Sequence, residues 1–126
     1  MAVGSGLLLQ ALSSCSPLNI YKTSVAENKI SVPVSLFEKT DFQIIKADNF
    51  ASDIVIRKEK NGNYSALLLR CTHADNPLTS IGNSFVCNLH GSRFDKDGNV
   101  TKGPAEQSLK KFNTQLVADQ IIISLT

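Results

Sequence analysis

The chain has 126 residues, of which 42% are hydrophobic and 19% are charged, so it is long enough for one compact domain and too short for two. Its 13 basic and 11 acidic residues give a net charge of +2 and are spread along the sequence, without the basic runs that grip a phosphate backbone. We therefore exclude nucleic acid as a partner. No apolar run in the sequence reaches the roughly 18 residues that a membrane-spanning helix needs.

The first residues are small and apolar, and this segment ends in Leu12-Ser13-Ser14-Cys15. The pattern resembles the signal segment of a bacterial lipoprotein, in which the cysteine of the lipobox receives the lipid. The resemblance implies a signal segment over 1–14, lipidation of Cys15, a tether over 15–28 and a domain over 29–126. The segment lacks the basic residues with which an export signal opens, so a frayed helix with a free thiol is the alternative.

From residue 29 onward, short apolar or alternating runs are separated by turn residues, a pattern that predicts strands. The Asn61-Gly62 dipeptide predicts a type I′ hairpin turn, and Asp97-Gly98 marks another tight turn. Sustained helical periodicity is absent from this part of the sequence, so we predict an all-β fold, an antiparallel sandwich or barrel. The predicted strands are 30–36, 42–46, 54–58, 64–70, 85–87, 92–94, 100–102, 112–117 and 121–125.

Two short segments each combine a cysteine with a histidine, namely Cys71-Thr72-His73 and Cys87-Asn88-Leu89-His90. His73 and His90 are the only histidines of the chain, which favours a shared metal centre over two unrelated core residues. Two thiolates and two imidazoles suit a tetrahedral zinc ion, and they also suit a [2Fe-2S] cluster. The ligand set alone leaves both possibilities open.

The residues after the second pair favour the cluster. His90-Gly91-Ser92-Arg93-Phe94-Asp95 is followed by Gly98 and by Gly103-Pro104-Ala105, and this run resembles the Rieske family over residues 64–112. The resemblance implies two ligand loops at one tip of a small antiparallel β domain, with a loop containing Pro104 over the cluster. It also implies one [2Fe-2S] cluster per chain, with Cys71 and Cys87 on the inner iron and His73 and His90 on the outer iron.

Some positions indicate a branch within that family. The two extra cysteines that pin the loops of cytochrome bc-type members are replaced by Asn76 and Leu89, which implies loops without a disulfide, as in the ferredoxin and oxygenase branch. Ser92 matches a hydroxyl that donates to a cluster sulfur, whereas Phe94 stands in the place of a tyrosine. Because hydrogen bonds to the sulfurs stabilise the reduced state, we expect an intermediate potential.

The resemblance implies one-electron transfer, because two neutral imidazoles in place of two thiolates ease reduction. We expect a redox component that turns over no small substrate by itself, since the sequence offers neither a nucleophile–base pair nor a mononuclear iron triad. Its expected partners are a cytochrome, a quinol-oxidising complex or an oxidoreductase subunit. With a lipid on Cys15 it would be anchored to the membrane on the periplasmic side of a bacterial cell envelope. The alternatives are a cytoplasmic ferredoxin of an oxygenase system and a zinc-stabilised structural domain.

Overall fold

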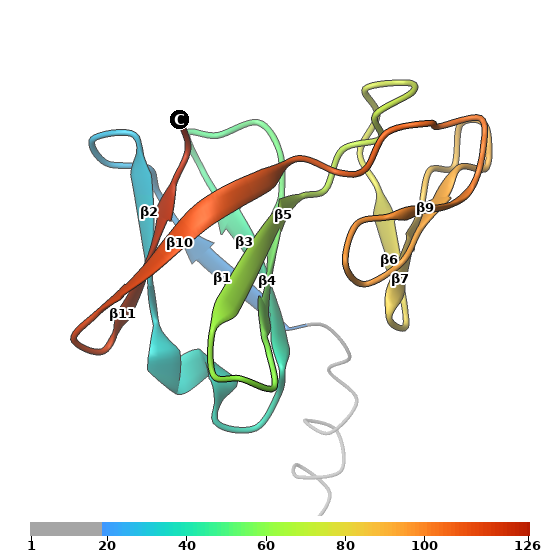
Figure 1. Ribbon diagram of the computed structural model, residues 1–126. Helices are drawn as coiled ribbons and strands as arrows, with labels where there is room; N and C mark the ends of the chain where they lie inside the picture. Colours follow the sequence, from blue (N-terminus) through green and yellow to red (C-terminus); the bar gives the residue numbers. More distant parts are fainter. Residues whose placement is uncertain (1–18) are drawn as a thin grey trace, which may run out of the picture.

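The computed structural model describes residues 19–126, and these form two sheets (Figure 1). The larger sheet contains β1 (Ile20–Thr23), β2 (Lys29–Pro33), β3 (Phe42–Ala47), β4 (Ile54–Lys58), β5 (Tyr64–Leu68), β10 (Lys111–Val117) and β11 (Gln120–Ser124). Its strand order is β1-β3-β4-β5-β10-β11-β2. The smaller sheet contains β6 (Thr79–Ile81), β7 (Ser84–Val86), β8 (Arg93–Phe94) and β9 (Val100–Lys102), in that order. The predicted all-β class is confirmed.

The larger sheet curls around its own apolar core. Along β2 and β11, buried and more exposed residues alternate, which places Ile30, Val32, Ile121 and Ile123 inside with 1% exposure or less. This is the two-residue period of a strand that has one face in a core. Burial of such aliphatic side chains contributes about 1.5–3 kcal/mol each, so the core holds this sheet together without residues from the smaller one.

A second core joins the two sheets and carries both cysteines of the predicted site. It contains Leu67 of β5, Phe85 of β7 and Phe94 of β8, together with the buried Cys71 and Cys87. The smaller sheet lies beside the larger one and is linked to it by long loops (Figure 1). The cysteines are therefore buried at the junction of the two sheets.

The structure differs from the sequence prediction at three elements. The strand predicted over 30–36 ends at Pro33, which lacks an N–H for the ladder, and the chain continues as the 3-10 helix η1 (Val34–Phe37). Strands β1 and β6 were not predicted, and β1 lies within the segment expected to be a tether. It pairs in parallel with β3, whereas every other strand pair is antiparallel among the described residues.

The two predicted tight turns are both present, but the first is not of the predicted type I′. A type I′ turn needs positive φ at both central residues, and around the first dipeptide only Gly62 has one, of 86°. The turn is closed instead by the Gly62 N–H, which donates to the Glu59 carbonyl over 3.0 Å. Gly98, with φ of 85°, donates to Asp95 over the same distance, so the two loops are built alike.

The predicted signal segment over 1–14 and the predicted lipidation site Cys15 lie outside the described residues. Within residues 19–126, no helix has the length and hydrophobicity to span a membrane. The predicted boundaries of the tether and of the domain stay predictions.

Candidate metal centre

Two ligand loops, loop 1 (residues 71–76) and loop 2 (residues 87–92), fold in the same way. In each loop the carbonyl of the cysteine accepts a hydrogen bond of 2.9 Å from the residue four positions later, and its N–H donates over 2.8 Å to the residue five positions later. The residue four positions later has positive φ, 50° for Asp75 and 83° for Gly91. Each loop is thus a closed turn around its cysteine, with the histidine on its outer side.

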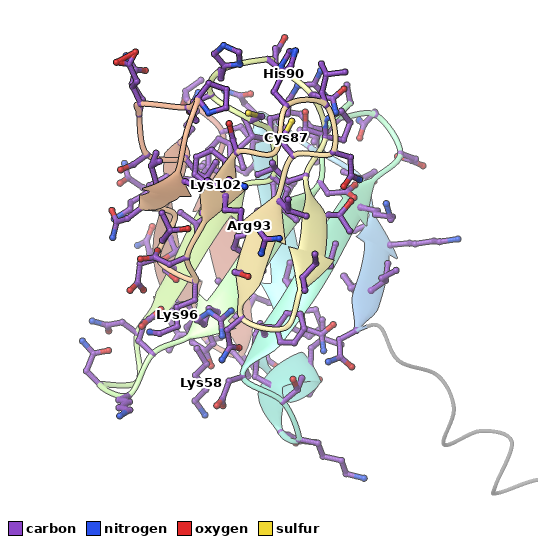
Figure 2. The ribbon with its side chains drawn as sticks, turned by 90° about the vertical axis from the view of Figure 1, so that its right-hand side faces the viewer. Lys58, Cys87, His90, Arg93, Lys96 and Lys102 are labelled. Carbon is purple, nitrogen blue, oxygen red and sulfur yellow. The ribbon has the colours of Figure 1, made fainter. Side chains whose placement is uncertain are left out.

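The structure brings the four predicted ligands together. Cys71 and Cys87 are 3% and 0% exposed, whereas His73 and His90 are exposed. The two imidazole rings face each other edge to face, with their centroids 5.3 Å apart. Figure 2 shows His90 at one end of the molecule, with Cys87 beneath it. The arrangement has a buried sulfur side and a solvent-exposed nitrogen side.

The environment of Cys87 favours the thiolate, which is the form that binds metals. Burial opposes ionisation, but hydrogen bonds from the backbone of Leu89 and His90 and from the side chains of Cys71 and Asn76 outweigh it, so the pKa of Cys87 lies below its ordinary value. Within residues 19–126, no three His, Cys, Asp or Glu side chains converge closely enough to hold a single metal ion. A two-iron cluster needs only two protein ligands at each iron, and the donors present fit it.

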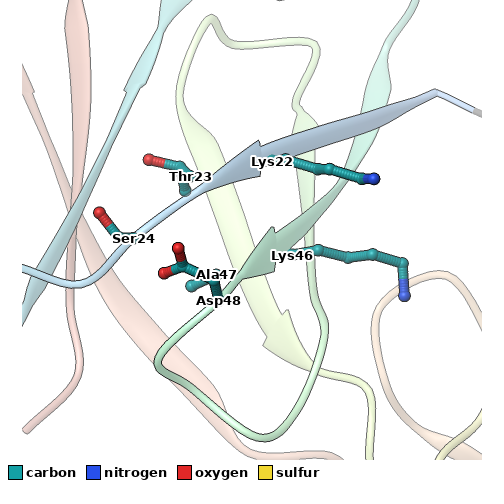
Figure 3. Close-up of a pocket in the computed structure, with 6 residues that line it drawn as sticks. All are labelled: Lys22, Thr23, Ser24, Lys46, Ala47 and Asp48. Carbon is teal, nitrogen blue, oxygen red and sulfur yellow. The ribbon is translucent and has the colours of Figure 1, made fainter.

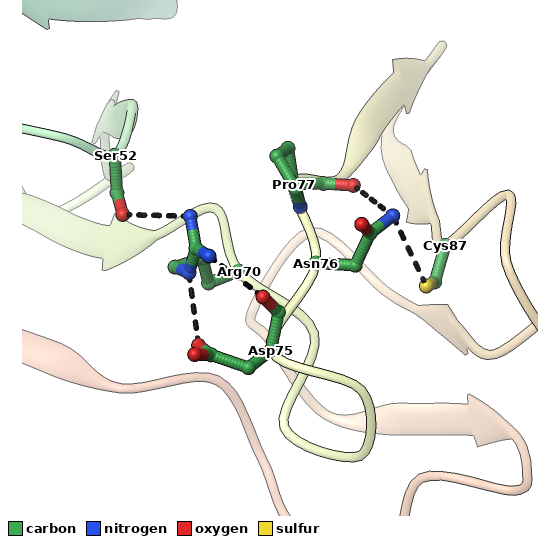
Figure 4. Close-up of polar contacts among 6 residues, drawn as sticks. All are labelled: Ser52, Arg70, Asp75, Asn76, Pro77 and Cys87. Carbon is green, nitrogen blue, oxygen red and sulfur yellow. Dashed lines mark hydrogen bonds and ion pairs between the residues drawn. The ribbon is translucent and has the colours of Figure 1, made fainter.

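Asn76 is a functional candidate that the sequence reasoning missed. Its side-chain nitrogen donates to Cys87 Sγ over 4.0 Å and to the Pro77 carbonyl over 3.4 Å (Figure 4). Its backbone carbonyl accepts the N–H of Cys71. One residue of loop 1 therefore contacts both buried cysteines. The signal that could have found it is an amide at the position where disulfide-linked members carry a cysteine.

Arg70 holds loop 1 from outside. Its guanidinium donates to the Asp75 carboxylate over 2.9 Å and to the Asp75 carbonyl over 2.7 Å, and it reaches Ser52 at 3.4 Å (Figure 4). Because Ser52 precedes β4, this contact ties the loop to the larger sheet. These two contacts with Arg70 fix Asp75, the residue with positive φ that closes the turn of loop 1.

Ser92, predicted to donate to a cluster sulfur, is 0% exposed. Its Oγ accepts the N–H of Ala105 over 3.0 Å, which leaves the proton of the hydroxyl to be donated elsewhere. Its carbonyl accepts the N–H of Cys87, so its position is fixed by the ligand loop itself.

The predicted covering loop is tied to both ligand loops. We call residues 103–109 the proline loop; Pro104 in it is exposed, while Ala105 and Leu109 are buried. Ala105 contacts loop 2 through Ser92, and the Thr72 hydroxyl of loop 1 donates to the carbonyl of residue 107 over 2.7 Å. The loop therefore closes the buried side of the site with apolar residues.

A surface hollow of about 540 Å³ lies elsewhere, against β1 and β3 (Figure 3). None of its residues belongs to a ligand loop or to the proline loop. It is lined by Lys22, Thr23, Ser24, Lys46, Ala47 and Asp48.

Residues 24–113 match the Rieske [2Fe-2S] domain family, and the match includes both ligand loops and the proline loop. The chain belongs to this family. The metal group of a Rieske domain is one [2Fe-2S] cluster, which decides between the two groups that the ligand set allowed and removes the zinc alternative. The match starts inside the segment expected to be a tether.

Curated proteins with sequence similarity include subunits from cyanobacteria. The chain is 33% identical over 73 residues to the cytochrome b6-f complex iron-sulfur subunit 2 of Trichormus variabilis, and the match covers 56% of this chain and 41% of the relative. It is 34% identical, over the same shares, to the cytochrome b6-f complex iron-sulfur subunit 1 of Synechocystis. The chain thus spans about two fifths of the length of the curated relatives it matches.

Solved structures with the same fold include a Rieske protein and a ferredoxin. The plasma membrane Rieske protein PetC3 from Synechocystis superposes with a TM-score of 0.61 at 23% identity, covering 75% of this chain and 98% of that one. The ferredoxin of carbazole 1,9a-dioxygenase from Nocardioides aromaticivorans superposes with a TM-score of 0.52 at 14% identity, covering 79% of this chain and 100% of that one. At these identities the likeness concerns the fold alone.

Proposed function

We propose that Cys71, His73, Cys87 and His90 hold the Rieske cluster and that the chain passes single electrons between a donor and an acceptor protein. The observation that carries this proposal is the geometry of the four side chains, two buried sulfurs and two exposed imidazoles at one end of the molecule. When bound, the cluster takes up and releases one electron. Membership in the Rieske family supports the same function.

The burial of the four side chains supports the ligand roles that the Rieske resemblance implies. Cys71 and Cys87 hold the inner iron, because they lie in the second apolar core, where the proline loop excludes water. His73 and His90 hold the outer iron, because their rings reach the surface. A partner that docks on this end meets the imidazoles first, so the histidines lie on the shortest route for the electron. Both rings are also placed to hydrogen-bond to that partner.

The test is to measure iron, sulfide and spectra of protein purified without oxygen. We expect about two irons and two labile sulfides per chain, a red-brown colour, and an average g value of the reduced protein below that of an all-cysteine cluster. His73→Ala and His90→Ala should each lose iron, and Asn63→Ala, in an exposed loop remote from the ligands, should keep it. Zinc in stoichiometric amount without iron would contradict the proposal.

We further propose that the protein works at the periplasmic face of a bacterial membrane, with a lipid on Cys15. Support comes from the lipobox pattern and from relatives that are named as cytochrome b6-f subunits or as a plasma membrane Rieske protein. The expected result is that the native chain fractionates with membranes and that Cys15→Ala is released. If both forms are soluble, a free ferredoxin becomes the better interpretation, which the absence of loop cysteines at Asn76 and Leu89 favours.

A further inference from the structure

The outer face of the smaller sheet carries two basic residues directly opposite each other. Arg93 of β8 and Lys102 of β9 are register partners, and both are exposed. A β-bulge at this point skips Thr101, so that Phe94 pairs with Val100 on the core side while Lys102 comes to lie opposite Arg93. Bulges commonly re-aim a side chain beside a functional site. We call Arg93 and Lys102 the basic pair.

Like charges directly opposite each other on neighbouring strands destabilise a sheet. Among the described residues, the basic pair forms no ion pair that would relieve this repulsion. A comparable pair exists on the larger sheet, where Lys22 and Lys46 are register partners and extend side by side (Figure 3). There Asp53 binds Lys46 at 2.7 Å and neutralises one charge. The basic pair therefore lacks the compensation that its counterpart has.

Further positive charge continues down the same face. Figure 2 shows Lys96 and Lys58 below the basic pair, and His90 above it. Lys96 is partly neutralised by Asp97 at 3.6 Å. The hollow of about 370 Å³ between Lys58 and Lys96 is lined by four basic residues and two acidic ones, Arg57, Lys58, Lys60, Lys96, Asp41 and Glu59.

The carboxylate of Asp95, the neighbour of β8, accepts the backbone N–H groups of residues 97 and 99 and is held within its own turn. Glu106 of the proline loop is exposed and forms no ion pair among residues 19–126. The basic pair is the part of this positive face nearest to the exposed histidine, and no acidic side chain of residues 19–126 forms an ion pair with it (Figure 2).

We propose that the basic pair is the docking face for a redox partner protein whose electron-exchanging site is bordered by Asp and Glu side chains. The inference rests on the proposed function and adds the charge of the partner. Leu89 at the tip is 58% exposed and supplies an apolar contact beside His90, as the centre of a protein interface requires. Opposite charges at the border of such an interface raise the rate at which the two proteins meet and fix their relative orientation. A membrane surface on this face would bury the histidines that the partner must reach.

Two small oxidants, one anionic and one cationic, test the electrostatic potential at this face. Reduced, cluster-loaded protein is mixed in stopped flow with ferricyanide, an anion, or with tris(phenanthroline)cobalt(III), a cation. The double variant Arg93→Gln, Lys102→Gln should react roughly threefold or more slowly with ferricyanide at low ionic strength, and faster with the cobalt complex. The difference should vanish at high salt, because screening removes exposed charge interactions. Lys22→Gln is the matched control and should leave both rates unchanged.

Poly-L-glutamate tests docking itself, as a mimic of an acidic protein surface. Titrated into the isotope-labelled, oxidised holoprotein at low salt, it should shift the amide resonances of β8 and β9 and leave those of β1 and β3 in place. The double variant should lose these shifts. Vesicles of anionic phospholipid, added in the same way, should leave the spectrum unchanged.

The outcomes separate this inference from the proposed function. Equal rates of the double variant and the native protein with both oxidants would overturn the docking face, while an intact visible spectrum would leave the electron-transfer function in place. Shifts of β8 and β9 by anionic vesicles, without any by poly-L-glutamate, would overturn it in favour of a membrane-binding face. Absence of the cluster from the native protein would overturn the proposed electron-transfer function, and with it the docking face.

Discussion

At the scale of single residues, we propose that Ser92 and Asn76 tune the midpoint potential of the cluster. Asn76 contacts the Cys87 sulfur, the Ser92 carbonyl accepts the N–H of Cys87, and both side chains have a proton to donate. Hydrogen bonds to cluster sulfurs stabilise the additional negative charge of the reduced state, so each donor raises the midpoint potential. The two differ in their own anchoring, because Ser92 is fixed within loop 2 while Asn76 reaches across from loop 1.

Ser92→Ala should lower the midpoint potential by several tens of millivolts. A charge-assisted hydrogen bond contributes about 1.5–3 kcal/mol, which for one electron corresponds to roughly 65–130 mV, and the solvent-exposed side of the site reduces the effect. Protein-film voltammetry at fixed pH measures it. Ser108→Ala is the control, because that hydroxyl is exposed and donates to the Asn99 side chain, which lies in neither ligand loop. An unchanged potential in Ser92→Ala would show that Ser92 is not a sulfur donor.

Asn76→Ala should lower the potential less than Ser92→Ala does, because its contact with Cys87 Sγ is long, at 4.0 Å. Asn76→Asp places an acceptor of the same shape beside the thiolate and should lower the potential further than alanine, through repulsion between like charges. Both variants should release iron to a chelator faster, since the only side-chain contact described between loop 1 and the Cys87 sulfur, apart from that of Cys71, is lost. The same potentials in Asn76→Asp and Asn76→Ala would contradict this role.

At the scale of elements, two glycine turns provide a matched pair. Gly98 and Gly62 have almost the same φ, 85° and 86°, in loops of the same hydrogen-bond pattern. A Cβ on Gly98 would lie 3.2 Å from Leu67 and 3.3 Å from Leu109, whereas a Cβ on Gly62 meets nothing within 4 Å. The two positions therefore share the backbone cost of a side chain at positive φ, and only Gly98 adds a packing cost.

Gly62→Ala should destabilise the fold by about 1–2 kcal/mol, the cost of a left-handed residue with a Cβ. Gly98→Ala should cost about 1–3 kcal/mol more, because the extra methyl overpacks the second core against Leu67 and Leu109. Chemical denaturation of the two variants and the native protein measures the difference. Equal losses in free energy of unfolding would mean that the core yields at Gly98 without cost.

The sequence predicted a strand correctly wherever the strand itself shows alternating or continuous apolar residues. The alternation in β2 and β11 and the turn dipeptides predicted most of the larger sheet and its hairpins. It failed for β1 and β6, which contain no buried residue and so show no apolar pattern of a core-facing strand. The equally short β7 and β8 were predicted, and each contains a buried phenylalanine. The ligands were predictable because both histidines fall beside cysteines, whereas the contact of Asn76 with Cys87 is a property of two loops in space.

At the scale of the whole molecule, one core stabilises the larger sheet and the other stabilises the region of the proposed metal centre. The first core lies within the larger sheet and contains neither cysteine, while the second contains both and joins the sheets. The smaller sheet has strands of only two or three residues, so it depends on that second core and on the loops that the cluster would tie together.

Removal of the cluster should therefore loosen one part of the molecule and spare the other. Metal centres stabilise the folded state by their binding free energy. Here the proposed ligands lie in two loops whose other mutual contacts are few, namely those of Cys87 with Asn76 and Cys71 and the ring contact of His73 with His90. We expect amides in 71–109 to exchange faster with deuterium after iron is chelated, and amides of β2 and β11 to keep their protection, since cooperative units open separately. Hydrogen exchange followed by mass spectrometry, with and without iron, resolves the two regions. Equal loss of protection in both would show that the sheets unfold as one unit, and unchanged protection in 71–109 would show that the second core alone holds the ligand loops in place.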